Sequence, residues 1–198
     1  MSKPGERLAK FVEVWEDLKA SPEITNILRH GYKISFKTRP ELSLPIKARE
    51  TKLAPNAMKI IRKEILDLVA KGAMRVVSLE EARRVKGFYS RLFVVPKPEV
   101  GKFRVIINMK PINRYIRKKS FKMEGLKDVK CLLRPGCYAG IVDLSDAYYH
   151  VKLHKKSRKF TRFIVDGQII EYTSLPMGLT DSPRVFTRIT KFVQSFLR

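Results

Sequence analysis

Two pairs of β-rich runs, each joined by a short turn segment, constrain the fold of this chain most strongly. Residues 91–97 and 102–108 are rich in valine, isoleucine and phenylalanine, and a short segment with proline and glycine separates them. Residues 160–165 and 168–173 flank an Asp-Gly pair, which favours two-residue turns because both residues tolerate a positive φ angle. The sequence therefore predicts two antiparallel hairpins.

An amphipathic helix is predicted near the N-terminus. Apolar residues recur three and four positions apart in residues 8–18, and the Ser21-Pro22 pair should end this helix because proline cannot continue it. We expect its apolar face to pack on the body of the protein, although a partner-binding helix has the same pattern. Residues 29–53 show no sustained period and indicate an extended connector, with a short strand candidate at 32–36.

Further helices are predicted on either side of the second hairpin. Residues 55–70 place isoleucine, leucine and valine on one face, with Gly72 as a stop and a short strand at 74–77. Residues 182–197 form the last amphipathic pattern, in which the Ser182-Pro183 pair is typical of an N-cap followed by proline in the first turn. Helices combined with antiparallel hairpins predict an α+β fold.

The charge of the chain indicates an anionic partner. Lys and Arg number 42 against 19 Asp and Glu, a net charge of +23 in 198 residues, which would cause strong self-repulsion without such a partner. Apolar residues make up 44% of the sequence, so a folded core is expected. Nucleic acid is the leading candidate. A membrane comes second, because no run approaches the roughly 20 apolar residues of a membrane span.

The N-terminus and the cysteines give a cellular setting. Residues 1–5 lead directly into charged residues without the apolar run of a secretory signal, so we expect an intracellular protein. Cys131 and Cys137 form neither a Cys-x-x-Cys pair nor a zinc-binding set with the three histidines. We interpret both as ordinary reduced cysteines.

One carboxylate stands at a position where metals are often bound. Residues 138–142 are a compact apolar run that ends abruptly at Asp143. A carboxylate at the end of a buried strand can hold a metal ion, because the sheet fixes the ligand while the loop leaves room for substrate. Aspartate also caps turns and helices at such positions, so Asp143 alone does not decide between these two interpretations.

Four segments in chain order resemble the successive conserved blocks of reverse transcriptases, in spacing as well as in residues. The resemblance covers roughly residues 55–198, and the leader from residue 8 to 36 is similar to the segment before the polymerase in one retrotransposon class. That class is the tyrosine-recombinase, or DIRS-like, class, and the Ty3/gypsy class is next in similarity. The four blocks are Phe93-Val94-Val95-Pro96-Lys97, Gly101-Lys102-Phe103-Arg104-Val105-Ile106-Ile107-Asn108, Val142-Asp143-Leu144-Ser145-Asp146-Ala147-Tyr148-Tyr149 and Leu175-Pro176-Met177-Gly178-Leu179 with Ser182-Pro183; Lys122-Met123-Glu124-Gly125-Leu126 and Val185-Phe186-Thr187 indicate the class.

The resemblance implies a right-hand polymerase with a leader at 1–54 and with fingers and an incomplete palm at 55–198. It also implies RNA-directed DNA synthesis with two Mg²⁺ ions about 3.5 to 4 Å apart. Asp143 matches the first palm aspartate, which is catalytic and binds both ions, and the carbonyl of Leu144 would be a further metal ligand. The implied partners are an RNA template, a DNA primer or RNA–DNA hybrid, and dNTPs.

The resemblance assigns the nucleotide site as well. Lys97 and Arg104 match cations that grip the triphosphate, although cations at a hairpin tip are by themselves usually just solvated. The backbone amides of Asp146 and Ala147 would hold the same triphosphate. Tyr148 matches the aromatic residue under the sugar that excludes a 2′-hydroxyl, while its residue type alone would equally suit a core position.

The loop before the last helix is the remaining part of the implied site. Met177 and Gly178 match residues that contact the incoming nucleotide, and Gly178 and Pro183 match contacts to the template and primer. Retroviral enzymes usually have glutamine where this chain has Met177. A methionine packs against a sugar or base but cannot form an amide hydrogen bond, so its contacts must differ there.

A departure from the family concerns two carboxylates. Family members carry a Tyr-x-Asp-Asp turn on the hairpin after the helix that here comprises residues 182–197, and this sequence contains no Asp-Asp pair. We therefore expect the chain alone to be inactive or nearly so, with further palm, thumb and RNase H regions supplied elsewhere. Two alternatives are a non-catalytic, basic nucleic-acid-binding remnant, and an interaction protein that uses the two amphipathic helices.

Overall fold

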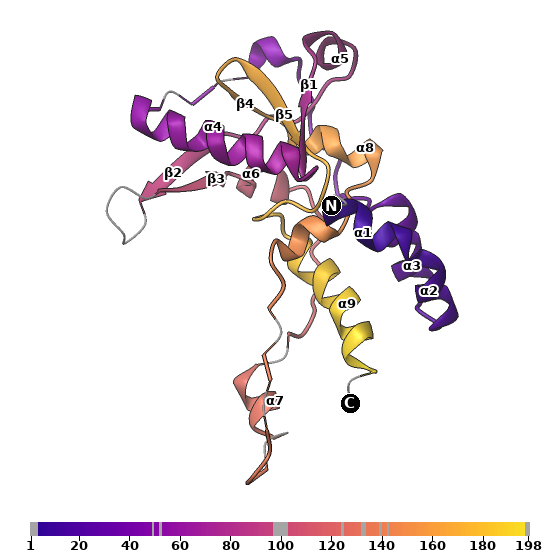
Figure 1. Ribbon diagram of the computed structural model, residues 1–198. Helices are drawn as coiled ribbons and strands as arrows, with labels where there is room; N and C mark the ends of the chain where they lie inside the picture. Colours follow the sequence, from indigo (N-terminus) through magenta and orange to yellow (C-terminus); the bar gives the residue numbers. More distant parts are fainter. Residues whose placement is uncertain are drawn as a thin grey trace.

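The computed structural model describes residues 4–48, 50–51, 53–96, 103–123, 125–131, 134–138, 140–141 and 143–196. Helices surround two small antiparallel sheets, and the chain combines both kinds of element as the sequence predicts (Figure 1). In chain order the elements are α1 (Pro4–Lys10), α2 (Val12–Asp17), α3 (Pro22–His30), η1 (Pro45–Lys47), α4 (Pro55–Ala70), β1 (Met74–Val77), α5 (Leu79–Arg84), β2 (Leu92–Pro96), β3 (Phe103–Ile107), α6 (Lys110–Asn113), α7 (Leu126–Lys130), η2 (Ala147–His150), α8 (Lys155–Arg158), η3 (Lys159–Thr161), β4 (Phe163–Val165), β5 (Gln168–Tyr172) and α9 (Ser182–Gln194).

The larger sheet has the strand order β1-β5-β4 and is antiparallel throughout. Its β4–β5 hairpin turns at Asp166 and Gly167, whose φ angles are 52° and 70°. These positive values are those of the predicted two-residue turn, which the Asp-Gly pair adopts at little steric cost. Strand β1 then pairs with β5 so that Met74 lies opposite Tyr172 and Val77 opposite Ile169. The predicted hairpin and the predicted short strand are both confirmed.

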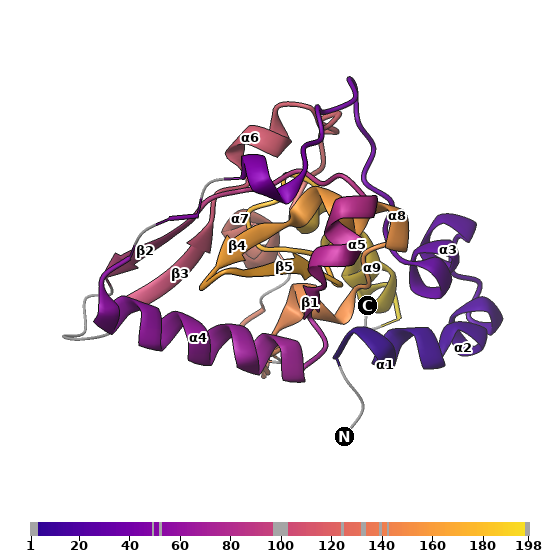
Figure 2. The ribbon, with the colours of Figure 1, turned by 90° about the horizontal axis from the view of Figure 1, so that it is seen from above.

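The smaller sheet consists of β2 and β3 alone, as predicted for the first hairpin. Helix α4 runs from this hairpin to β1, which Figures 1 and 2 show from two directions. Gly72 ends the helix with a φ of 71°. The amides of Gly72 and Ala73 bond back to the carbonyls of Val69 and Leu68, a pairing that satisfies two of the last helical acceptors. The predicted glycine stop is therefore confirmed.

One hydrophobic core joins the N-terminal segment to the rest of the chain. Ile27 and Leu28 of α3 belong to the same buried cluster as Ile61 of α4, Ile170 of β5 and Val185 of α9. Burial of such side chains is the main favourable contribution to folding, at roughly 25 cal/mol per Å² of apolar surface. Within the described ranges, no helix is long and apolar enough to cross a lipid bilayer.

The N-terminal helices differ in detail from the prediction. The expected single helix over 8–18 is interrupted at Phe11, which separates α1 from α2. Helix α2 already ends at Asp17, and Lys19 after it has a positive φ of 63°, so the predicted stop at Ser21-Pro22 is wrong. Pro22 instead begins α3, because proline suits the first helical turn. The ring of Trp15 lies 5.5 Å from that of Phe192 in α9, so this leader packs on the body of the protein as expected.

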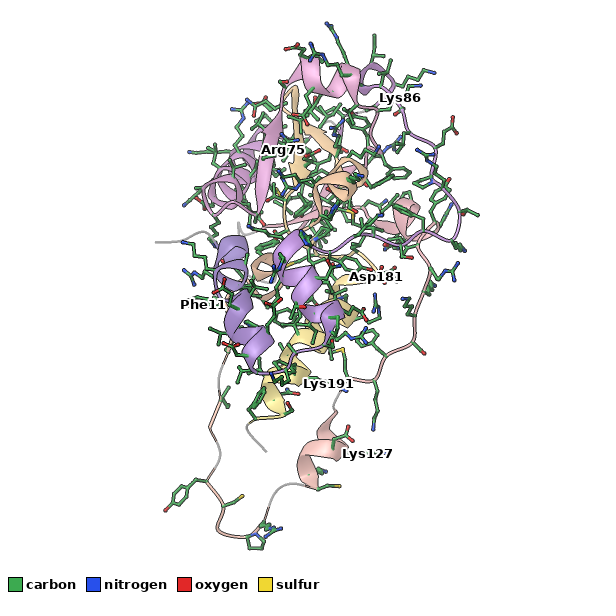
Figure 3. The ribbon with its side chains drawn as sticks, turned by 90° about the vertical axis from the view of Figure 1, so that its right-hand side faces the viewer. Phe11, Arg75, Lys86, Lys127, Asp181 and Lys191 are labelled. Carbon is green, nitrogen blue, oxygen red and sulfur yellow. The ribbon has the colours of Figure 1, made fainter. Side chains whose placement is uncertain are left out.

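The expected strand over 138–142 is not formed in the described part of that run. Tyr138 is 103% exposed and Ile141 is 96% exposed. A strand needs a neighbour to accept and donate its backbone hydrogen bonds. In the described residues, no strand lies beside this segment. Figures 1 and 3 show it, together with α7, extending away from the body of the molecule. The prediction of a buried strand before Asp143 is therefore wrong in this structure.

Candidate active site

The β2–β3 hairpin provides one wall of the candidate site. The backbone of Arg104 pairs with Val95, and Phe103 pairs with Pro96. Lys97 and the side chain of Arg104 lie outside the described residues, so their predicted contacts with a triphosphate stay predictions. The hairpin that carries both residues is formed as predicted.

The turn at 143–150 begins with the exposed residues 143–145 and ends in the 3₁₀ helix η2. Asp146 adopts a left-handed conformation with a φ of 58°, and the ammonium group of Lys71 lies 2.6 Å from its carboxylate. Neither the amide of Asp146 nor that of Ala147 donates a hydrogen bond to another backbone group in the described ranges. The predicted contacts of both amides with a triphosphate stay predictions.

Asp143 and Leu144 are exposed at the start of this turn. Among the described residues, Asp143 has no ion-pair partner, and no group of three or more histidine, cysteine, aspartate or glutamate residues could hold a metal ion. One free carboxylate and one carbonyl are fewer ligands than a magnesium or calcium site normally uses. The described residues alone therefore do not form a complete metal site.

The two tyrosines of η2 have different surroundings. The ring of Tyr148 packs edge-on against Phe186 of α9, with 5.5 Å between the ring centroids. Tyr149 is buried and its ring stacks on Tyr172 at 6.5 Å. Burial raises the pKa of Tyr149 to about 12, with smaller contributions from the negative charges of Glu64 and Asp146. Tyr148 thus contacts the last helix, while Tyr149 faces the interior of the site.

The loop before α9 is fixed by a side chain distant in sequence. Asn113 donates a hydrogen bond of 2.8 Å to the carbonyl of Gly178, and its own carbonyl accepts one of 2.9 Å from the amide of Thr180. Gly178 has a φ of 85°, a value that favours glycine. Met177 beside it is 55% exposed. The loop therefore presents Met177 on a rigid backbone.

The start of α9 differs slightly from the prediction. Ser182 was expected as the N-cap, but it is the first residue of α9, and Asp181 precedes the helix. The hydroxyl of Ser182 is buried and donates to the carbonyl of Pro176 at 2.7 Å, so it supports the loop instead of the helix end. Pro183 lies in the first helical turn, where its missing amide costs no hydrogen bond.

A cavity of about 370 Å³ brings these elements together. Its lining comes from α4, the β2–β3 hairpin, η2, β5 and the loop before α9, and it lies within the roughly 300–1,000 Å³ range of small-molecule sites. Of the residues predicted to contact a nucleotide, Met177 and Gly178 border it. Tyr148, Asp146 and Ala147 do not line it. The lining residues are Glu64, Ile65, Leu68, Met74, Leu92, Val105, Ile106, Ile107, Tyr149, Tyr172, Met177 and Gly178.

Two contributors to this site were not predicted. Asn113 acts across 65 positions of sequence, and nothing in its neighbourhood of the chain indicates Gly178 as its partner. Tyr149 directly follows the predicted Tyr148, and the apolar residue Val151 two positions later could have indicated that Tyr149 is the buried one of the pair.

Sequence comparison decides the family. The family described as "Reverse transcriptase (RNA-dependent DNA polymerase)" has a sequence model that matches residues 95–198, more than half of the chain. The chain belongs to the reverse transcriptase family. The four blocks that resemble this family in sequence contribute the hairpin, the turn at 143–150 and the loop before α9 in the structure.

Relatives of this reverse transcriptase domain are retroviral and retrotransposon polyproteins. The Pol polyprotein of transposon 412 from Drosophila melanogaster is 27% identical over 110 residues, which are 53% of this chain and 9% of that polyprotein. The Gag-Pol polyprotein of bovine immunodeficiency virus is 24% identical over 168 residues, 75% of this chain and 11% of that protein. The Pro-Pol polyprotein of simian foamy virus type 3 is 26% identical over 149 residues, 75% of this chain and 12% of that protein. The chain thus spans about a tenth of these relatives.

A solved structure shows the same fold as this reverse transcriptase domain. The foamy viral protease-reverse transcriptase, solved in complex with double-stranded DNA, superposes with a TM-score of 0.59. The match covers 99% of this chain and 36% of that one at 19% identity. The predicted α+β fold of the reverse transcriptase type is therefore confirmed. Reverse transcriptases as a family use divalent metal ions and bind nucleic acids.

Proposed function

We propose that this chain supplies the fingers and part of the palm of an RNA-directed DNA polymerase from a retroelement. One observation carries the proposal: three of the four motif blocks converge on a single cavity. Ile106 of the β2–β3 hairpin, Tyr149 of η2 and Met177 of the loop before α9 all line it. Separate sequence blocks that meet at one concave site are typical of a substrate pocket.

In this proposal the incoming dNTP lies between the hairpin and the turn at 143–150. Lys97 and Arg104 contact its triphosphate, where their charge offsets the negative charge that grows in the transition state. The amides of Asp146 and Ala147 donate to the same phosphates. The carboxylate of Asp143 is exposed and has no ion-pair partner in the part of the chain that the structure describes, which is in keeping with this arrangement, since a ligand held in a salt bridge would be less accessible.

The sugar, base and template contacts follow from the loop geometry. Met177 and Gly178 border the cavity that would receive the nucleotide, and Gly178 and Pro183 would contact the template and primer. Tyr148 is proposed to exclude a 2′-hydroxyl, and its edge-on contact with Phe186 would fix its ring. Methionine at position 177 would pack against the nucleotide by dispersion forces rather than by hydrogen bonds.

The metal ions need ligands beyond those that the described residues provide. Asp143 and the carbonyl of Leu144 would bind Mg²⁺, which supplies Lewis-acid stabilisation of the phosphoryl oxygens when it is bound. The Asp-Asp pair of the family is absent from this sequence. We therefore propose that residues 1–198 alone do not polymerise, and that a downstream palm segment with two aspartates is required.

The element class is the finer part of the proposal. The segments 122–126 and 185–187 favour the DIRS-like class, with Ty3/gypsy second. Sequencing the reading frames next to this one in its element tests the class. A tyrosine-recombinase frame would support the DIRS-like assignment, and an integrase frame would contradict it.

Primer extension tests the function. The chain is fused to a downstream reverse transcriptase segment that carries the Asp-Asp pair, and it is assayed with an RNA template, a DNA primer, dNTPs and Mg²⁺. Extension that disappears in the Asp143→Asn fusion supports the proposal. A folded fusion that binds RNA but extends no primer would instead favour a non-catalytic nucleic-acid-binding protein, whose binding needs neither Mg²⁺ nor Asp143.

A further inference from the structure

A second cavity, with a polar lining, lies at the end of the molecule opposite the β2–β3 hairpin. It has a volume of about 360 Å³ and lies between α3, residues 31–35 and the start of α9. Figures 1 and 2 show α3 and α8 at the opposite end of the body from β2 and β3, and Figure 3 looks onto this end. None of the residues with a predicted polymerase role lines this cavity.

The lining is strongly cationic. Its positive or protonatable side chains outnumber its one carboxylate, that of Glu23, which is already engaged by Arg188 at 2.5 Å. A concave site with one sign of charge concentrates counter-ions of the other sign. The cationic and protonatable lining residues are His30, Lys33, Lys119, His154 and Arg184.

Arg184 carries a hydrogen-bond donor without an acceptor. The residue is 9% exposed, and its terminal Nη2 donates to the hydroxyl of Tyr32 at 3.2 Å. Its Nε, however, is buried without a hydrogen-bond partner among the described residues. The carboxylate of Asp181 is 3.6 Å away, close enough for ionic attraction but too far for a hydrogen bond. Buried donors are nearly always satisfied, so this one indicates an acceptor from outside the chain.

The cations around this cavity also affect His154. Its pKa is lowered, first by partial burial and then by the surrounding cations Lys33, Lys156, His30 and Arg158. The ring Nδ1 accepts a hydrogen bond of 3.1 Å from the amide of Lys156, so the neutral ring carries its proton on Nε2 and can donate from there. An anion in the cavity would offset the neighbouring cations and meet a further donor.

We propose that this cavity binds a phosphate group, separately from the polymerase site. A phosphate has several strong acceptor oxygens and a charge near −2, which match the guanidinium of Arg184 and the ammonium groups of Lys33 and Lys119. The phosphate can come from free inorganic phosphate or from the backbone of a nucleic acid. This site does not depend on the polymerase assignment, because it shares no residue with the cavity beside Met177.

The three histidines of the chain allow a direct test. Their ring signals are followed by NMR while inorganic phosphate is added to the 198-residue protein, and single His→Gln variants assign them. We expect saturable shifts at His30 and His154 and a higher pKa of His154. His150, whose ring bonds to the carbonyl of Ser145 at 3.1 Å outside the cavity, should not move. The absence of saturation, or equal shifts at all three rings, would overturn the proposal.

Variants that remove lysines at the cavity rim distinguish a specific phosphate site from non-specific attraction to a basic protein. Lys33→Ala combined with Lys119→Ala removes two exposed rim cations, and Lys47→Ala with Lys86→Ala removes two exposed cations elsewhere. We expect the first pair to weaken phosphate binding at His154 about tenfold and the second to leave it nearly unchanged. Equal effects of both pairs would show only non-specific attraction to a basic protein, which contradicts the site.

A single-stranded oligonucleotide distinguishes the two phosphate sources. If the backbone is the ligand, the oligonucleotide should shift His154 at lower concentrations than inorganic phosphate does. The salt dependence of its binding should then fall by about two counterions in the Lys33 and Lys119 variant. If inorganic phosphate shifts His154 but the oligonucleotide does not, the site takes the free anion.

Discussion

The side-chain nitrogen of Asn113 donates a hydrogen bond of 2.8 Å to the carbonyl of Gly178, which borders the candidate nucleotide cavity. The other end of the same amide accepts from Thr180 at 2.9 Å. One side chain thereby fixes both ends of the short segment that follows Met177. Because Asn113 is not among the residues that line this cavity, its effect on a nucleotide would be indirect, through the position of this loop.

Asn113→Ala should therefore loosen the loop without removing a nucleotide contact. Two hydrogen bonds are lost, each worth about 1 kcal/mol, so the free energy of unfolding should fall by about 1–2 kcal/mol. In an active fusion, the KM for dNTP should rise more than kcat falls. Urea unfolding and steady-state primer extension measure both effects. Asn56→Ala, at an exposed position of α4, is the control. Unchanged stability and KM in the Asn113 variant would contradict the role.

Three glycine-to-alanine changes should form a graded series in stability. Gly178 has a φ of 85°, but a Cβ there would lie no closer than 3.7 Å to Met109, so only backbone strain of about 1–2 kcal/mol is expected. Gly31 has a φ of 87° and a Cβ would approach the amide nitrogen of His154 to 2.7 Å, so its substitution should cost more. Gly140 has open space and should change little. Thermal unfolding checks the order, and an equal loss at all three positions would refute it.

Local sequence patterns correctly predicted those elements whose geometry depends on residues adjacent in the chain. The Asp166-Gly167 turn and the Gly72 helix stop each depend on a few adjacent residues, and both are present. The run 138–142 was mispredicted for the opposite reason. Its apolar residues fit a buried strand, but a strand also needs a partner, and the sequence of the run carries no information about one. The exposure of Tyr138 and Ile141 is the result.

The sequence predicted those residues of the candidate site that a motif identifies by residue type and order in the chain. Met177 and Gly178 were identified by their motif and do border the cavity. Asn113 and Arg184 were not identified, because their importance comes from partners that the fold brings close. Asn113 meets Gly178 across 65 positions, and Arg184 meets Tyr32 across 152. Neither pairing leaves a periodic or local signature in the sequence.

The buried ion pair of Arg162 and Glu171 should be important for stability. Their side chains are 1% and 2% exposed at a separation of 3.0 Å, and Arg75 also contacts Glu171 at 2.6 Å. Glu171→Gln keeps the shape but removes the nearest charge partner of the buried Arg162 and leaves it Glu81 at 3.8 Å, so a loss of about 3 kcal/mol is expected. Glu80→Gln, in the exposed pair with Arg84, should cost at most about 0.5 kcal/mol. Chemical denaturation measures both, and a loss under about 1 kcal/mol for Glu171→Gln would contradict the prediction.

The raised pKa of Tyr149 should make the protein less stable at alkaline pH. Burial raises this pKa to about 12, whereas an unfolded tyrosine titrates near about 10. Between these values the unfolded state releases its proton while the folded state retains it, so the stabilisation present below pH of about 10 is lost as the pH rises towards about 12.

At pH 11 the loss due to Tyr149 should be about 1.4 kcal/mol relative to pH 9, out of a larger total to which other buried tyrosines contribute. Tyr149→Phe removes the titrating group and should reduce the loss by about that amount. Tyr138→Phe, at a fully exposed side chain, is the matched control and should behave like the unmodified protein. Urea unfolding at the two pH values measures the difference. If Tyr149→Phe loses as much stability as the unmodified protein, the proton on Tyr149 does not stabilise the fold.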